Sequence, residues 1–599
     1  MRKKSVISMG ILLLVTVLVA GSGYLYDTAE DMVEKQADST SGGESSAASA
    51  LASVMETSEA SKPLRDKDTL YAEDDPDSVV DMYLTVSRGN ASENTDHSWE
   101  DINDLSVYDY DAMGVDRYQV EGLLQVGDAN GPVSGALGYG EVTPNATVQI
   151  RGQSSSESPQ KNYKIRLKDN HGTWNGQQTI ALNKHESDGL RFRNKLSFDL
   201  MKEIPQIMSL RTQFVHLYVK DETGDGEATF KDYGLYTQVE QLNKTALKAH
   251  GLDKNGQLYK VNEFEFYRYE DVIKLADDPD YDQAAFEKML EIKGSNDHSK
   301  LIAMLNDLND YSEPIEDVIE DHFNMENLTY WMAYQILTGN IDTQNRNMYL
   351  YSPQNEQTWY IYPWDMDGSF FATEKSLRGK ESYASWERGI SNYWGNILFR
   401  RCLKSEEFRK QLDLAIQDLR SNVLAKKHVQ SLVNEYAAVV KPYVYAEPDL
   451  QYAQVTSDIY DEIVKKLPDE VEDNYQKYVE SIQFPMPFFI GVPQVKDGKM
   501  TENWDVSYDI QQEDISYNAM ISSNYDMKDP VATYSGVWPE MTFDQLPAGQ
   551  YFIKVTATDA SGHTQQAFDY YPTENGKAYG EKCFYVMKDG SIKEDTASE

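Results

Sequence analysis

Apolar and polar residues alternate with a period of two along several stretches in the first half of the chain, and this pattern predicts β-strands. Such stretches are residues 79–87 (VVDMYLTVS), 146–152 (ATVQIRG), 162–169 (NYKIRLKD), 213–220 (QFVHLYVK) and 232–240 (DYGLYTQVE). A polar turn separates the last two, so we expect them to pair as a hairpin. A globular region is therefore expected to begin near Val79.

Two other stretches favour helices. Residues 187–204 (SDGLRFRNKLSFDLMKEI) predict a helix between strands, opened by a Ser or Asp cap. Residues 325–337 (MENLTYWMAYQIL) belong to a mostly helical region that continues to about residue 480. Helical spacing places its large apolar side chains on one face: Met325, Leu328, Trp331, Met332 and Ile336.

Beyond Pro485 the pattern returns to short alternating strands with turn residues between them. Residues 546–562 (LPAGQYFIKVTATDASG) are typical of a strand pair at one end of an immunoglobulin-like sandwich. We therefore predict an α+β domain over residues 79–484, followed by a separate immunoglobulin-like β-sandwich over residues 485–590.

The N-terminus differs from both regions because a basic start precedes a mostly apolar run from Val6 to Ala20. This order, over residues 1–23, indicates a signal peptide or a short membrane anchor and places the rest of the chain outside the cytoplasm. Residues 24–78 are rich in Ser, Ala and acidic residues, so we expect a disordered linker. The protein is predicted to be secreted or anchored at the cell surface.

The charge of the chain limits its partners. The 599 residues carry a formal net charge of −42 at pH 7. This charge would repel nucleic acids and anionic membranes, so we expect no nucleic-acid partner and membrane contact only through the N-terminal segment. Basic proteins and divalent cations fit the charge, although a solvated acidic surface is the more ordinary explanation.

Residues that often build metal or redox sites are scarce. Cys402 and Cys583 are too few for a disulfide framework and are expected to be unpaired. With no CxxC pattern and nine histidines, a zinc site is disfavoured. The acidic stretch DETGDGEA (221–228) has a spacing similar to a calcium loop, but strands flank it, so an acidic hairpin turn is the preferred interpretation.

One strand-like stretch, residues 360–371 (YIYPWDMDGSFF), ends in two carboxylates, Asp365 and Asp367. Before it come a helix, a polar loop with Asp342 and Asn347, and the first strand of a hairpin. Protein kinases have the same order: a loop Asp, an Asn five residues later, a hairpin and a metal-binding Asp. Because Mg²⁺ prefers hard oxygen ligands, the order predicts that Asp342 receives or orients a hydroxyl proton and that Asn347 and Asp365 bind metal.

An Asp and an Asn five residues apart also occur by chance in a chain with 98 acidic residues. The prediction therefore depends on the helix, the hairpin and the strand-terminal carboxylates taken together. The His-Arg pair that precedes the kinase loop Asp is absent here, and so is the Phe-Gly that follows the metal Asp.

A cation for phosphate groups is expected from an earlier strand. Alternation places Lys161 on the apolar face of the 162–169 strand, where a lone cation needs a partner, and Lys164 on the solvated face. Lys161 is therefore preferred over Lys164. Arg151 and the serines from Ser154 to Ser156 precede it as a phosphate-facing loop, although a simple polar turn would have the same sequence.

The stretches RGQSSSESPQKNYKIRL, SDGLRFRNKL, YGLYTQVEQ, GNIDTQNRNMYLY and WYIYPWDMDGSF occur in this order. Over roughly residues 80–400 they resemble the spore coat protein H (CotH) kinase family. The resemblance implies a divergent, atypical protein-kinase-like fold with a β-rich N-lobe and a mainly helical C-lobe. It also implies ATP- and Mg²⁺-dependent phosphorylation of protein Ser or Thr, with Mn²⁺ or Ca²⁺ as alternative metals.

The same resemblance implies roles for individual residues. Asp342 corresponds to the catalytic aspartate, and Asn347 and Asp365 to metal ligands, with Asp367 as an assisting carboxylate. The cofactor-binding positions that it implies lie in three other segments: Arg151, Ser154, Lys161 and Glu240.

The leading hypothesis is an extracytoplasmic CotH-like kinase that phosphorylates surface or coat proteins, including basic, Ser-rich ones. The alternative is a catalytically idle, kinase-like scaffold or adhesin that binds protein or glycan through its β-sandwich. A glycosidase is disfavoured, because Asp365 and Asp367 at positions i and i+2 of a strand lie only about 7 Å apart on one face.

Overall fold

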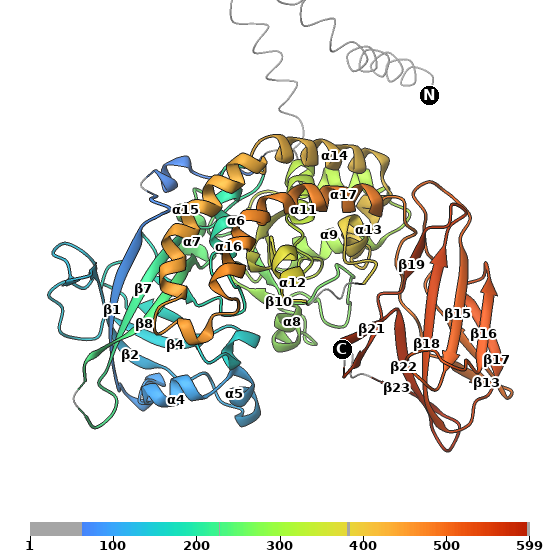
Figure 1. Ribbon diagram of the computed structural model, residues 1–599, viewed down its shortest axis with the longest axis horizontal. Helices are drawn as coiled ribbons and strands as arrows, with labels where there is room; N and C mark the ends of the chain where they lie inside the picture. Colours follow the sequence, from blue (N-terminus) through green and yellow to red (C-terminus); the bar gives the residue numbers. More distant parts are fainter. Residues whose placement is uncertain (1–62, 73, 227, 380–383, 575, 596–599) are drawn as a thin grey trace, which may run out of the picture. The chain divides into compact units, whose positions relative to one another are not determined.

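The computed structural model describes residues 63–595 except 73, 227, 380–383 and 575 (Figure 1). Residues 60–599 form one compact unit. The predicted signal peptide or anchor and most of the predicted linker lie outside the described residues. Among the helices that the structure describes, none is long and apolar enough to span a membrane.

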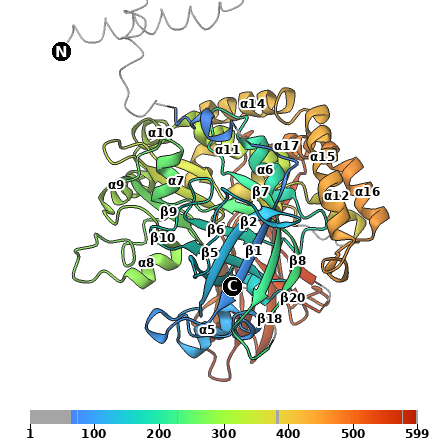
Figure 2. The same ribbon diagram turned by 90° about the vertical axis from the view of Figure 1, so that its left-hand side faces the viewer.

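The N-terminal strands form an eight-stranded sheet in the order β1-β7-β8-β6-β5-β4-β2-β3. Because β1 pairs with β2 as well as with β7, seven of these strands close into a ring, seen from one side in Figure 2. Its core contains fully buried side chains such as Leu84, Val148 and Ile165. The strands are β1 (Val79–Ser87), β2 (Val120–Asp128), β3 (Gly131–Pro132), β4 (Ala146–Arg151), β5 (Asn162–Leu167), β6 (Thr179–Asn183), β7 (Thr212–Asp221) and β8 (Phe230–Glu240).

A four-stranded sheet in the order β10-β9-β11-β12 leads to the candidate site. Its strands are β9 (Gln257–Val261), β10 (Leu290–Ile292), β11 (Met348–Ser352) and β12 (Tyr360–Pro363). The helices, which are distributed along the chain, are α4 (Trp99–Asp104), α5 (Val107–Met113), α6 (Arg193–Met201), α7 (Lys244–Ala249), α8 (Gln283–Met289), α9 (Ser299–Asn309), α10 (Ile315–His322), α11 (Met325–Thr338), α12 (Ala372–Leu377), α13 (Ile397–Lys404), α14 (Glu406–Ser421), α15 (Lys426–Val444), α16 (Ser457–Lys466) and α17 (Glu470–Ser481). The first two, α4 and α5, pack on the N-terminal sheet.

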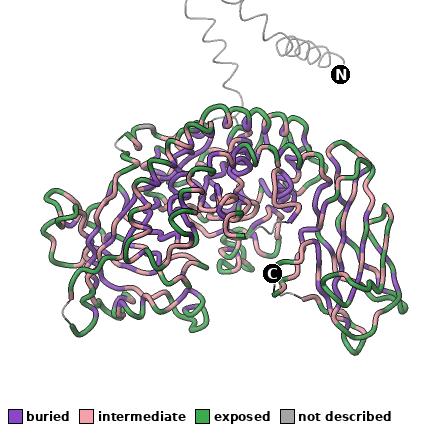
Figure 3. Tube along the Cα trace, in the orientation of Figure 1, coloured by how far each residue is buried: buried purple, intermediate pink, exposed green. Residues whose placement is uncertain are grey.

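The predicted strands of the first half are confirmed, and so is the acidic hairpin turn between β7 and β8. Helix α11 is confirmed and ends at Gly339, whose left-handed φ of 66° closes it. Its side chains are buried on almost all sides rather than on one face, because α14, α17 and β12 all pack against it. Figure 3 shows this burial along the chain.

The helix predicted over residues 187–204 is shorter than expected. Helix α6 begins only at Arg193 and has no side-chain cap on its first turn. Arg191 lies in the left-handed region at φ 62°, which prevents an earlier start. Asp188 instead accepts hydrogen bonds from the backbone N–H groups of Leu190 and Arg193 in the loop before the helix.

The end of the predicted linker is folded, which corrects the predicted start of the globular region. Leu64 is buried in the main core, and the hydroxyl of Tyr71 donates to Asp66. Asp66 in turn contacts the imidazole of His250 at 2.7 Å. The alternating pattern begins only at β1, so it does not reveal a segment that is held by a single apolar side chain and by ion pairing.

Residues 486–595 form a C-terminal β-domain with a core of its own. One sheet has the order β13-β14-β17, and a second has the order β16-β15-β18-β22-β23 with β19 beside β18. Side chains of both sheets share that core, so β-structure in this region is confirmed, whereas its likeness to immunoglobulin domains stays a prediction. The strands are β13 (Gln494–Lys496), β14 (Lys499–Asn503), β15 (Ser516–Ser522), β16 (Ala532–Gly536), β17 (Glu540–Asp544), β18 (Gly549–Thr558), β19 (Thr564–Gln566), β20 (Tyr570–Thr573), β21 (Gly576–Tyr579), β22 (Glu581–Val586) and β23 (Ile592–Glu594).

Both cysteines are unpaired, as predicted. Cys402 lies in α13 and Cys583 in β22, and each is buried. Neither is therefore part of a disulfide or an exposed reactive thiol.

Candidate functional site

The first component of the site is the Asp365 turn, which we define as residues 364–368. Strand β12 stops at Pro363, and Asp365 then adopts a left-handed conformation with φ 51° ahead of a short 3₁₀ helix. Two hydrogen bonds fix this turn: the N–H of Trp364 donates to the carbonyl of Asn347 at 3.2 Å, and the N–H of Met366 donates to the Asn194 amide oxygen at 3.1 Å. A non-glycine residue in this region carries backbone strain, which is common at functional sites.

The second component is the Asp342 loop, residues 339–347. Asn347 also has a left-handed φ, 57°, and its amide nitrogen donates to the carbonyl and to the carboxylate of Asp342, each at 3.0 Å. The two components touch where a Cβ on Gly368 would lie 2.6 Å from the side-chain oxygen of Asn340. Gly368 is needed for this close approach, and the fold thereby joins the loop to the turn.

The three carboxylates of these components influence one another. Burial raises the pKa of Asp365, and the charge of Asp367 raises it further. The Asp342 side chain is 62% exposed, yet desolvation and the Asp367 charge raise its pKa against the opposing effect of Arg346. Asp342, Asp365 and Asp367 are thus brought together, with more negative charge than their surroundings neutralise.

The donor set suits a divalent cation bound jointly with phosphate. Within the described part of the chain, Asp365 accepts no hydrogen bond although it is half-buried, and Asn347 uses its amide nitrogen but not its oxygen. Among the described residues, no three His, Cys, Asp or Glu side chains form a ready metal cluster. Mg²⁺ commonly takes only one or two carboxylates and completes its shell with water and substrate phosphates, so two carboxylates and an amide oxygen fit it.

Two cations flank the Asp365 turn. The Arg151 guanidinium lies 5.9 Å and the Lys260 ammonium 6.0 Å from the centre of the Trp364 ring. Desolvation lowers the pKa of both groups, and the charge of Asp365 opposes that effect in each case. Arg151, a predicted cofactor-binding position, therefore lies beside the Asp365 turn, and its role there stays a prediction. Lys260, in β9, was missed, and the only sequence signal for it is a lone lysine in the apolar strand QLYKV.

Lys161 lies elsewhere. It is buried just before β5, and its ammonium donates to the backbone oxygen of Ser156 at 2.6 Å. Its electrostatic neighbours are acidic residues outside the site, and burial lowers its pKa. Lys164, which alternation placed on a solvated face, is instead half-buried, and Arg151 is among the groups that influence its pKa. Ser154 is exposed in the loop that follows Arg151.

Glu240 is enclosed in an ion-pair network and does not face the site carboxylates. It accepts hydrogen bonds from the Arg211 guanidinium at 2.5 and 3.1 Å and lies 2.9 Å from the imidazole of His250. Burial alone would raise its pKa, but these partners outweigh that effect and lower the pKa to about 2. Its role in the structure is to bind β8 to the folded N-terminal segment.

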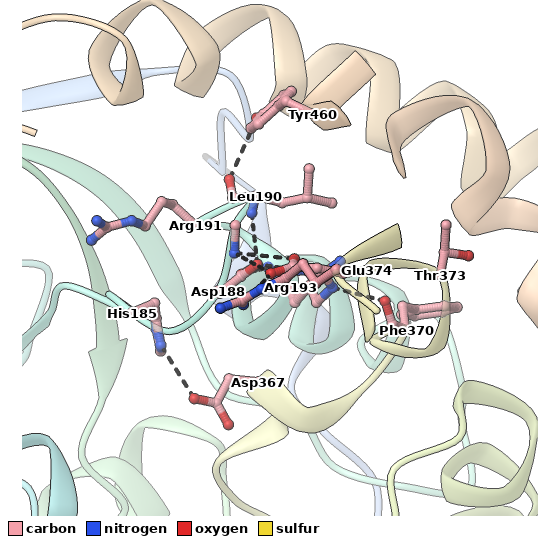
Figure 4. Close-up of polar contacts among 12 residues, drawn as sticks. His185, Asp188, Leu190, Arg191, Arg193, Asp367, Phe370, Thr373, Glu374 and Tyr460 are labelled. Carbon is pink, nitrogen blue, oxygen red and sulfur yellow. Dashed lines mark hydrogen bonds and ion pairs between the residues drawn. The ribbon is translucent and has the colours of Figure 1, made fainter. Parts of the chain in front are cut away.

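The loop before α6 supplies site contacts that sequence reasoning missed (Figure 4). His185 lies 3.6 Å from the Asp367 carboxylate and 3.3 Å from the amide nitrogen of Asn194. Asn194 therefore links His185 to the Asp365 turn. The sequence pattern of SDGLRFRNKL predicts a helix and contributes to the family resemblance, but it assigns no role to His185 or Asn194, because their contacts arise from tertiary structure.

Beside these contacts lies a buried charged group that we call the Arg193 cluster: Asp188, Arg193 and Glu374. The Arg193 guanidinium bonds to both carboxylates and, through Nε, to the carbonyl of Phe370 at 2.8 Å. Glu374 also accepts the N–H of Gly189 at 3.1 Å. This cluster fastens the chain that follows the Asp365 turn to the loop before α6.

A surface cavity of about 400 Å³ lies along α15 and reaches Ser457 of α16. None of its lining residues belongs to the Asp342 loop, the Asp365 turn or the other predicted site positions. We therefore place the candidate site at the carboxylates and not at this cavity.

Sequence comparison assigns the family. The family profile described as CotH kinase protein matches residues 148–479, more than half of the chain, and this protein belongs to that family. Inner spore coat protein H of Bacillus subtilis (strain 168) is similar, with 20% identity over 350 residues that cover 57% of this chain and 91% of that protein.

Two solved structures show weaker likeness. The proinflammatory kinase CtkA of Helicobacter pylori is 12% identical and covers 53% of this chain and 94% of its own, with a TM-score of 0.26. The twitchin kinase region of C. elegans is 10% identical and covers 68% of this chain and 70% of its own, with a TM-score of 0.14. At these TM-scores neither comparison defines the fold, and the family assignment depends on the sequence match.

Proposed function

We propose that this protein is a kinase that transfers the terminal phosphoryl group of ATP, with a divalent cation, to Ser or Thr hydroxyls of protein. The observation that carries the proposal is the joining of the Asp342 loop to the Asp365 turn, which gathers three carboxylates and the Asn347 amide. Membership of the CotH kinase family supports the same chemistry. We further propose that the ring of N-terminal strands, which we call the barrel, and the helical region act as the two lobes of a divergent kinase fold.

Each group has a defined task in this proposal. Asp342, the most exposed of the three carboxylates, accepts or orients the proton of the attacking hydroxyl. Asp365 and the Asn347 oxygen would hold Mg²⁺, with Asp367 assisting, and Mn²⁺ or Ca²⁺ are the alternatives. The bound metal neutralises phosphate charge as it develops. Arg151 and Lys260, both near the Trp364 ring, supply positive charge for the phosphates.

The substrate and its location are inferred from chemistry and from a relative. The net charge of −42 favours basic protein substrates over acidic ones. The relative in Bacillus subtilis is named as an inner spore coat protein, so we propose a coat or surface protein as substrate. An extracytoplasmic setting, with ATP supplied there, is part of the same proposal.

The test is transfer of labelled phosphate from ATP by the full chain in Mg²⁺ or Mn²⁺, to itself or to a basic, Ser-rich protein. Wild type is expected to incorporate label. The Asp342→Asn variant should lose at least about 100-fold in rate, because general base catalysis is commonly worth that much. Asp321→Asn is the matched control, because Asp321 is an exposed aspartate on α10 and its loss should leave the rate unchanged.

A melting-temperature measurement separates the kinase from the idle scaffold. ATP with metal should raise the melting temperature of wild type, since a ligand that binds only the folded state stabilises it. Absence of both a shift and transfer would favour the scaffold. Full activity in Asp342→Asn would contradict the assigned role of Asp342.

A further inference from the structure

Residues 384–396, which come just before α13, hold the Asp342 loop in place through hydrogen bonds. The side-chain nitrogen of Asn392 donates to the carbonyl of Ile341 at 3.0 Å, and that of Asn396 donates to the carbonyl of Gln344 at 2.8 Å. The hydroxyls of Tyr393 and Thr343 lie 3.3 Å apart. These contacts hold three successive parts of the loop that carries Asp342. We call residues 384–396 the support segment.

The other side of the support segment contacts the C-terminal β-domain. Ser385 donates to the side-chain oxygen of Gln565, and the amide nitrogen of Gln565 donates to the hydroxyl of Ser391 at 3.4 Å. The indole N–H of Trp386 donates to the carbonyl of Ala567 at 3.1 Å. Its ring lies 5.2 Å from that of Phe568. The domain is thus attached near the start of the segment and again at its middle.

The contacts between the support segment and the C-terminal β-domain, which we call the junction, are rigid because they are buried. Gln565 has 0% of its surface exposed, and Ser391 has 1%. Separating them would leave buried polar groups unpaired, which costs more than an ordinary hydrogen bond gains. Ser391 and Asn392 are adjacent in sequence, and one contacts the β-domain while the other contacts the Asp342 loop. A displacement of β19 is therefore transmitted across one peptide unit to Ile341.

Asp342 itself needs such support because its own contacts are few. The backbone N–H of Asp342 reaches the Asn340 side chain only at 3.4 Å, and its carboxylate is held by Asn347 and by Arg346 at 3.8 Å. Phosphoryl transfer depends on the position of the hydroxyl and of the group that receives its proton, and a shift of about 1 Å can cost about 100-fold in rate.

We propose that the C-terminal β-domain positions the Asp342 loop through the support segment, with Gln565 and Ser391 as positioning residues. A partner that binds the β-domain and displaces β19 would then lower the rate of phosphoryl transfer without contacting the site carboxylates. The effect on transfer presupposes the proposed kinase function, whereas the mechanical link between domain and loop does not.

The experiment compares full-length wild type with Ser391→Ala, which removes one hydroxyl and leaves the fold intact. Amide hydrogen exchange is measured for residues 339–347, together with kcat and the KM for ATP. We expect faster exchange in this loop, a decrease of about tenfold in kcat and an unchanged KM for ATP. A merely structural weakening would instead speed exchange throughout the chain.

Two further variants complete the test. Gln565→Ala should reproduce the effect of Ser391→Ala from the other side of the junction. Gln550→Ala is the control, because among the described residues the Gln550 side chain bonds to Cys583 and Tyr585 within the β-domain, and its loss should leave the loop unchanged. Unchanged exchange of residues 339–347 in Ser391→Ala and Gln565→Ala would overturn the proposal, as would faster exchange with an undiminished kcat. If wild type transfers no phosphate but both variants speed loop exchange, the proposed function fails and the positioning link stands.

Discussion

The Asp365 turn and the Arg193 cluster lie side by side and contain the same kinds of charged group, but their carboxylates differ in the hydrogen bonds that they accept. In the Arg193 cluster, every carboxylate oxygen of Asp188 and Glu374 accepts a hydrogen bond. In the Asp365 turn, the carboxylate of Asp365 accepts none among the described residues, and that of Asp367 has only His185 at 3.6 Å.

This difference separates structural from functional charge. A buried carboxylate with all its acceptor sites filled stabilises the folded state only through its own partners and has no capacity left for a ligand. A half-buried carboxylate without donors destabilises the free protein and gains most when a cation arrives. The Arg193 cluster holds the backbone next to the site in place. The carboxylate oxygens of the adjoining Asp365 turn are left without hydrogen-bond donors. The following predictions test that division, beginning with the largest expected effect.

Replacing Asp365 by Asn should remove phosphoryl transfer and spare the fold. We expect kcat/KM to fall by at least about 10³-fold, equivalent to about 4 kcal/mol of transition-state stabilisation. The free energy of unfolding should stay the same or rise slightly, since a neutral amide is easier to bury than an unpaired carboxylate. Steady-state kinetics and urea denaturation measure both quantities. A clear loss of stability would place Asp365 with the structural charges.

Replacing Arg193 by Met should have the opposite outcome. It leaves Asp188 and Glu374 buried without their shared cation, so we expect a loss of about 3–5 kcal/mol in the free energy of unfolding. Arg346→Met is the control, because its ion pair with Glu263 is exposed and should cost less than about 1 kcal/mol. If the two variants lost the same amount of unfolding free energy, the buried Arg193 cluster would contribute no more to stability than an exposed ion pair.

The network around Glu240 predicts a pH dependence of stability. Burial would lower the pKa of His250, but hydrogen bonds to Asp66 and Glu240 raise it from 6.5 to about 9. Its stabilisation is therefore complete below pH 6.5 and is lost as the pH rises through about 9. Glu240, with its pKa lowered from 4.5 to about 2, contributes fully above pH 4.5 and loses its contribution toward pH 2.

The measurement is the free energy of unfolding of wild type and His250→Gln at several pH values. Between pH 6.5 and 9 the wild type should lose on the order of 3 kcal/mol more than the variant does. Parallel profiles would show that His250 is not charged in the folded protein. Transfer activity per folded molecule should be unaffected at pH 6.5, because this network lies outside the Asp365 turn.

Asn194 connects the two regions, and its replacement should have a modest effect on both stability and transfer. Asn194→Ala removes the acceptor for the N–H of Met366, so we expect about 1 kcal/mol less stability and about a tenfold lower kcat. Asn145→Ala removes a buried side chain that, among the described residues, bonds to the backbone of Leu124 in the N-terminal sheet. It should cost stability without lowering kcat, and a decrease in kcat would mean that the turn responds to any loss of packing.

Much of the fold is present in local sequence pattern. Alternation located β1, β4, β5, β7 and β8, because each of these strands has one face in a continuous core. It did not locate β2, β3 or β6. The order of helix, loop and hairpin located Asp342, Asn347 and Asp365 for a similar reason, since a hairpin necessarily brings its two ends together. These elements depend on neighbours within about 25 residues, and that range is visible in a sequence.

Contacts between distant segments were not visible. Lys260 reaches Trp364 only because β9 pairs with β11, and His185 reaches Asp367 only because the loop before α6 folds over the turn. Lys161 was chosen by the rule that an apolar face demands a partner for a cation. The rule holds, but the partner is the backbone oxygen of Ser156 in the preceding loop and no ligand is required.

The pairing of Asp66 with His250 also decides where this chain can be cut. A recombinant version that begins at Val79 would discard Leu64, Asp66 and Tyr71, opening one wall of the main core and leaving His250 with a single carboxylate. A version that begins at residue 60 retains all three. A protease that cleaves before residue 63 would therefore leave the folded unit intact, whereas one that cleaves between residues 66 and 79 would remove part of it.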